Sequence, residues 1–141
     1  MGGMPEVTLS APSQYVAGVV LLTVVTIEFG GWFLTTVARG RVPMTEFQRA
    51  FARAGHAHAG VLVTLGLVCL VLADATGLTG ALGWLARLGV PAAAVLVSAG
   101  FFLSSLGRDV HRPNRLIALV WLGALALAGG VVTLGTGLLA A

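Results

Sequence analysis

Four long apolar stretches, separated by short polar segments, dominate the hydrophobic pattern of this 141-residue chain. A helix needs roughly 20 apolar residues to cross about 30 Å of hydrocarbon, and each stretch reaches that length. The stretches run from about 15 to 37, 51 to 73, 88 to 106 and 116 to 139. We therefore predict an all-α membrane protein in which residues 1–141 form a single four-transmembrane-helix bundle.

Local signals refine where the helices begin. Thr45 followed three residues later by Gln48 is typical of a capping box, so we expect the second helix to begin outside the hydrocarbon. Residues 74–80 have the composition of a turn. We expect Trp84 to lie in an interfacial half-turn and Pro91 to lie in the first turn of the third helix.

The charged residues predict the orientation. Charged residues make up only 9% of the chain, against about 25% in soluble domains, so no water-facing globule can be built from it. All eight basic residues are arginines, and only Arg87 lies between the second and third stretches. The other seven flank the remaining two connections: Arg39, Arg41, Arg49, Arg53, Arg108, Arg112 and Arg115. The positive-inside rule then predicts an N-out/C-out, multi-pass protein.

Composition also bears on localisation and partners. The abundance of arginine, alanine and glycine indicates a GC-rich bacterial genome, so we expect the bacterial inner membrane. The basic residues follow topology and form no stripe with interleaved aromatic residues, which excludes a nucleic-acid interface. The expected partners are the lipid bilayer and either further copies of the chain, as a homo-oligomer, or the other subunits of a larger membrane complex.

The strongest candidate for chemistry is Glu28, which lies within the first apolar stretch. Nine residues separate it from the end of that stretch, which corresponds to a depth of roughly 14 Å at 1.5 Å per residue. A carboxylate at that depth is costly, so we expect it to face the bundle and to have a partner. His56 and His58 lie at comparable depth on the antiparallel second helix, and His58 is the better match.

The spacing of the two histidines limits what they can bind. Residues two apart point about 200° apart on a helix, so one undistorted helix cannot direct both rings at one metal ion. The small residues around them leave space for a cofactor or a close helix: Gly55, Ala57, Ala59 and Gly60.

Several functions are compatible with this Glu/His cluster. His56 or His58 can ligate haem or a transition-metal ion, with Glu28 orienting the ring. Alternatively, Glu28 can carry protons in a small proton-coupled transporter. The cluster can also line a pocket for a quinone or lipid, or simply lock the helices of an accessory subunit together. The chain has no nucleophile–base set, phosphate loop or paired carboxylates, so we expect no enzymatic activity from it alone.

Other polar residues have simpler interpretations. Arg108, Arg112 and Arg115 are candidates for binding lipid headgroups, together with His111 between them. We expect the serines of the third helix to bond their own helix backbone: Ser98, Ser104 and Ser105.

Two features of the apolar stretches concern packing. Cys69, the single cysteine, is expected to be a small buried apolar residue. Ala126 and Gly130 form a small-xxx-small pair, which allows close helix packing within one copy or between copies.

Residues 51–63, FARAGHAHAGVLV, resemble a segment of small bacterial four-helix membrane proteins to which no activity is assigned. The resemblance extends over the four stretches and includes Glu28 and the residues 100–103, GFFL. The GHAHAG part is also faintly similar to helix starts in the haem-copper oxidase catalytic-subunit superfamily, which implies haem or metal binding, although the later ligand histidines are missing. A glutamate in the first of four helices is similar to the small multidrug resistance transporters, but the arginine bias differs from their dual topology.

Overall fold

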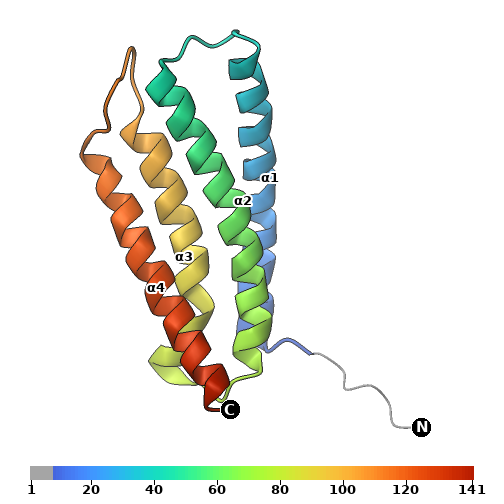
Figure 1. Cartoon of the computed structure of the whole chain (residues 1–141). Coiled ribbons are helices and arrows are strands. Elements are labelled where there is room, and N and C mark those ends of the chain that lie inside the picture. Colours follow the sequence, from blue (N-terminus) through green and yellow to red (C-terminus); the bar gives the residue numbers. More distant parts are fainter. Residues whose placement is uncertain (1–7) are drawn as a thin grey trace.

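The protein forms four long α-helices joined by short connections, as the computed structural model shows for residues 8–141, the part of the chain that it describes (Figure 1). The elements are α1 (Ala11–Ala38), α2 (Glu46–Asp74), α3 (Gly80–Ser104), the 3-10 turn η1 (Arg115–Ile117) and α4 (Ala118–Leu139). By length and composition, all four helices are able to cross a membrane. The predicted four-helix bundle is confirmed, with no strand in the described range.

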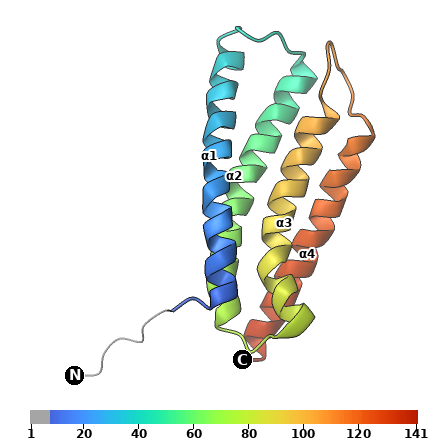
Figure 2. The same ribbon diagram turned by 180° about the vertical axis from the view of Figure 1, so that it is seen from behind.

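The helices form a curved row in the order of the sequence rather than a closed square. α3 packs extensively against both α2 and α4, whereas α1 packs mainly against α2 and only marginally against α3. In the described range α1 does not contact α4. The start of α1 and the C-terminus lie at one end of the bundle, which we call the terminal end (Figure 2). The connections 39–45 and 105–114 lie at the opposite, arginine-rich end.

The starts of α1 and α2 follow capping rules. Ser10 accepts a hydrogen bond from the backbone N–H of Ser13 at the start of α1. At the start of α2, Thr45 and Gln48 form both bonds of a capping box, which confirms the prediction. The side chain of Gln48 also donates to the carbonyls of Ser105 and Gly107, at 3.0 Å each. The cap therefore ties α2 to the end of α3.

The third helix begins earlier than predicted. α3 already includes Trp84, which therefore lies in the helix rather than in an interfacial half-turn. Pro91 lies in the interior of α3 and not in its first turn. Proline removes one backbone donor in a helix, but here its ring packs close to Gly66 of α2. The prediction was wrong because it placed the helix start near Pro91, whereas α3 begins at Gly80, after an N-cap residue, Thr79, whose side chain makes no capping bond.

Small residues bring α3 and α4 into close contact. A Cβ atom added to Gly89 would lie 2.6 Å from the Cα of Gly130 and 2.8 Å from the carbonyl oxygen of Ala126. The predicted small-xxx-small pair therefore packs within a single copy, against α3. Cys69 is buried in the same region of the core, as expected. By contrast, large apolar side chains are exposed along all four helices, as a hydrocarbon solvent requires.

The first prediction concerns this contact. Gly89→Ala should lower the melting temperature of the detergent-purified protein, because overpacking a helix contact costs about 1–3 kcal/mol. Gly135→Ala in α4 is the matched control, since no atom lies within 4 Å of its added Cβ. Equal melting temperatures for the two variants would contradict the close approach of α3 and α4.

Candidate functional site

The structure does not assemble the predicted Glu28, His56 and His58 cluster. Glu28 is exposed, and it has no hydrogen bond or ion pair with any residue between 8 and 141. The expectation that it faces the bundle is therefore wrong for a single copy. The face of α1 that packs inward carries Val24, Ile27 and Gly31. Glu28 follows Ile27 directly and so points about 100° away from that face.

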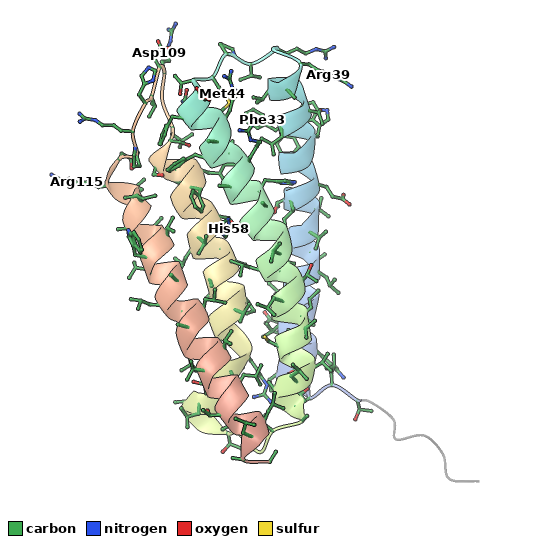
Figure 3. All side chains as sticks on the ribbon, in the orientation of Figure 1. Phe33, Arg39, Met44, His58, Asp109 and Arg115 are labelled. Atoms are coloured by element: carbon green, nitrogen blue, oxygen red, sulfur yellow. The ribbon has the colours of Figure 1, made fainter. Side chains whose placement is uncertain are left out.

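The two histidines contact different helices. The ring of His56 lies against the glycine pair of α1, where a Cβ added to Gly30 or Gly31 would lie 3.3 Å from it. His58, labelled in Figure 3, is exposed and lies on the side of α2 that faces α3. Its ring centroid lies 5.2 Å from that of Phe101 of α3. The nearer histidine to α1 is thus His56, not His58 as the depth argument suggested.

This arrangement limits metal or haem binding by one copy. The rings of His56 and His58 point to α1 and α3 respectively, so they do not converge on one ion. The described residues contain no group of three or more metal-ligating side chains. The Nδ1 atom of His58 lies 2.7 Å from the carbonyl oxygen of Ala54, which leaves only Nε2 without a contact of this kind. The space beside Gly55 is filled by Phe102 of α3 rather than left open.

A groove of about 560 Å³ lies between α1 and α3, with α2 as its floor. Its volume is within the range of small-molecule sites in proteins, roughly 300–1,000 Å³. Aliphatic residues make up most of its lining, and four polar residues complete it. The α1 wall includes Val16, Val20, Thr23, Thr26 and Ile27, the floor Ala59 and Val63, and the α3 wall Pro91, Ala92, Ala94, Val95 and Ser98.

The groove exists because α1 and α3 do not meet. Ala59 of α2, at its floor, and Ala92 and Ala94 of α3 are too small to fill the space between the helices. On the two rims Val19 and Val95 are exposed, so the groove is open along its length to the surroundings of the bundle. In a membrane those surroundings are lipid.

One hydroxyl group of the groove has no partner. Ser98 Oγ is the only buried side-chain oxygen or nitrogen without a hydrogen bond in the part of the chain that the structure describes. The prediction that Ser98 bonds its own backbone is therefore wrong, although it is right for Ser104 and Ser105. The hydroxyls of Thr23 and Thr26 bond carbonyls of their own helix at 2.6 Å. Tyr15, the fourth polar residue of the lining, is exposed, so Ser98 supplies the buried free hydroxyl of the groove.

A second polar site, missed in the sequence, lies at the terminal end. The carboxylate of Asp74 accepts hydrogen bonds from the backbone N–H and hydroxyl of Ser10, from the hydroxyl of Ser13 and from Arg87, at 2.7–2.9 Å. Arg87 also donates to Ser13 Oγ at 3.1 Å and to the carbonyl of Gly83 at 3.0 Å. We call Ser10, Ser13, Asp74 and Arg87 the polar clamp. It joins α1, α2 and α3, so its role in this chain is structural.

Only part of this could have been found from the sequence. Asp74 and Arg87 are oppositely charged residues that flank the same connection, and this is a usable signal for an ion pair. Ser10 and Ser13, at the start of α1, become relevant only once α1 is known to pack beside α2. The groove has a weaker signal in the small residues 92–94.

The arginines of the second arginine-rich connection are exposed. Arg108 and Arg112 lie in the connection 105–114, and Arg115 is the first residue of η1. Figure 3 labels Asp109 and Arg115 in this region. Arg108, Arg112 and Arg115 form no ion pair with described residues. Their binding of lipid headgroups stays a prediction.

Searches against protein-family models, curated proteins and solved structures give no match for this chain.

The polar clamp gives the second prediction. Asp74→Asn should lower the melting temperature because it removes the charge that pairs with Arg87, whose side chain is only 13% exposed. A double-mutant cycle with Arg87→Gln should give a coupling of about 0.5–3 kcal/mol, as for other residues in direct contact. Arg115→Gln is a control, because that arginine is exposed. Additive effects of the two clamp substitutions would contradict the pairing.

Proposed function

We propose that the protein is a multi-pass membrane subunit that binds a long apolar molecule with a small polar group, of the quinone or lipid class, in the groove between α1 and α3. The observation that carries this proposal is the apolar groove of about 560 Å³ with the buried, unpartnered hydroxyl of Ser98. A pocket lined mainly by aliphatic residues favours an aliphatic or isoprenoid chain. A single hydroxyl favours a ligand with few polar atoms.

The open side of the groove supports entry from the bilayer. Val19 and Val95 on its rims are exposed to the hydrocarbon that surrounds the bundle. A lipid-soluble ligand then diffuses in laterally and needs no aqueous channel. A water-soluble solute would have to cross that same hydrocarbon, which is unfavourable for polar groups.

The polar group of Ser98 favours a carbonyl or hydroxyl on the ligand. A buried hydroxyl without a partner is costly, and a ligand oxygen removes that cost by accepting its hydrogen bond. A quinone carbonyl is such an acceptor. An ester carbonyl of a lipid is another, and the two classes are distinguished by experiment.

The membrane context of the proposal is the bacterial inner membrane with both termini outside. It rests on the arginine bias, since seven of the eight arginines lie toward the end of the bundle opposite the termini. The alternatives based on histidine-ligated haem, on a metal ion and on proton transport through Glu28 have less support. They need Glu28 beside a histidine, and the exposed Glu28 forms no hydrogen bond or ion pair with His56 or His58.

The third prediction tests the groove by filling it. Ala92→Trp places an indole in the groove and should abolish cross-linking of a photoreactive azido-quinone and of a diazirine phosphatidylcholine in liposomes. Ala128→Trp is the matched control, because Ala128 is exposed on α4, which does not line the groove. The cross-linked peptides are identified by mass spectrometry. Unchanged labelling in the Ala92→Trp variant, with normal folding, would exclude the groove as the binding site.

The fourth prediction identifies the ligand class. Ser98→Ala should weaken quinone binding about five- to tenfold, as expected for the loss of about 1 kcal/mol from one hydrogen bond. If a lipid is the ligand instead, its ester carbonyl accepts this bond, and Ser98→Ala should then weaken labelling by the diazirine phosphatidylcholine and leave quinone binding unchanged. The measurement is the dissociation constant from quenching of tryptophan fluorescence. Equal affinity of the two proteins for the quinone would rule out Ser98 as its anchor.

A further inference from the structure

A second hollow lies between α1 and α2 near the arginine-rich end. It has a volume of about 310 Å³ and is lined by Leu34, Thr35, Val37, Ala38, Arg49 and Arg53. We call it the α1–α2 pocket. Toward this end of the bundle the two helices diverge, as Figures 1 and 2 show. It shares no residue with the groove between α1 and α3.

The α1–α2 pocket has one basic and one apolar wall. Arg49 and Arg53 are four residues apart on α2, so they project from the same face, one turn from each other. Leu34 and Val37 belong to the last turns of α1 and provide the apolar surface. Such a wall suits an acyl chain, while the guanidinium groups suit a phosphate.

The charge of the pocket is not neutralised within the chain. Neither Arg49 nor Arg53 forms an ion pair with a residue of the described range 8–141. Arg49 donates to the carbonyl of Met44 at 3.1 Å, which holds its guanidinium beside the connection 39–45. Glu46, one turn before Arg49, is the nearest acidic residue in the sequence. Arg39 and Arg41 add two positive charges to the connection 39–45.

The position of the pocket matches the membrane interface. α1 ends at Ala38, which itself lines the pocket, and the polar connection begins with Arg39 at the arginine-rich end (Figure 3). Arginine residues at that level of a bundle attract anionic headgroups, by about 1 kcal/mol for each residue. The acyl chain of the same molecule would then run along Leu34 toward the hydrocarbon.

We infer that the α1–α2 pocket binds an anionic glycerophospholipid, whose phosphodiester contacts Arg49 and Arg53 and whose acyl chain lies against α1. The charge complementarity and the apolar wall next to it select this occupant. A soluble phosphate compound has the same anionic group but lacks the chain, and phosphatidylcholine has the chain but no net charge.

The fifth prediction tests this site by native mass spectrometry of the detergent-purified protein with added phosphatidylglycerol or phosphatidylcholine. Arg53→Gln should weaken phosphatidylglycerol binding about fivefold, and Arg49→Gln with Arg53→Gln roughly thirtyfold. Phosphatidylcholine binding should not change. Both side chains are exposed, so the variants should keep the melting temperature of the parent protein.

Two further experiments test whether the ligand is a lipid or a soluble phosphate compound, and whether it binds in the α1–α2 pocket. Millimolar glycerol 3-phosphate should not displace phosphatidylglycerol, whereas Ala38→Trp, which fills the pocket, should reduce its binding. The comparison variant carries Arg112→Gln and Arg115→Gln, which lie at the same end but outside the pocket. The inference is overturned if this variant loses the preference for phosphatidylglycerol while the Arg49/Arg53 variant keeps it, or if glycerol 3-phosphate competes.

Discussion

The carboxylate of Asp74 fixes the helix arrangement on which the rest of the structure depends. It accepts bonds from Ser10, Ser13 and Arg87 and so joins the first three helices at the terminal end. Each polar group of the polar clamp has a hydrogen-bond partner, which matters more here than in water, because unpaired polar groups near hydrocarbon are costly. At the opposite end Gln48 bonds the carbonyls after α3, and this ties α2 to α3 a second time. These contacts join the helices at both ends of the bundle.

The groove follows from the packing of the helices. α3 and α4 are in close contact because Gly89 and Gly130 allow their backbones to approach. No comparable pair of small residues lies between α1 and α3, and α1 contacts α3 only marginally. The clamp joins α1 to α3 only at the terminal end, and the space that remains between the two helices is lined mostly by aliphatic residues, with Ser98. The proposed function depends on this unfilled volume and not on the ionisable residues Glu28, His56 and His58.

The sequence predicted the number of helices and the start of α2, because hydropathy and capping are local properties of a segment. It did not predict where α3 begins, because the start at Gly80 lacks a side-chain cap and Pro91 resembles a first-turn residue although it lies inside the helix. The direction of Glu28 depends on which face of α1 packs against α2, and that of His58 on which face of α2 packs against α3. A stretch that is apolar on all sides does not specify its packing face. The groove and the free hydroxyl of Ser98 arise from what neighbouring helices leave unfilled. Such features need the tertiary structure.

The proposed function requires that the space between α1 and α3 is a binding site rather than a gap that closes in the membrane. An experimental structure of the protein in lipid nanodiscs made from its native membrane tests this most directly. If the groove is a binding site, that structure should show elongated density between α1 and α3 that reaches Ser98, with the polar clamp intact. A structure in which α1 packs directly on α3, or in which a helix of a second copy fills the groove, would contradict it.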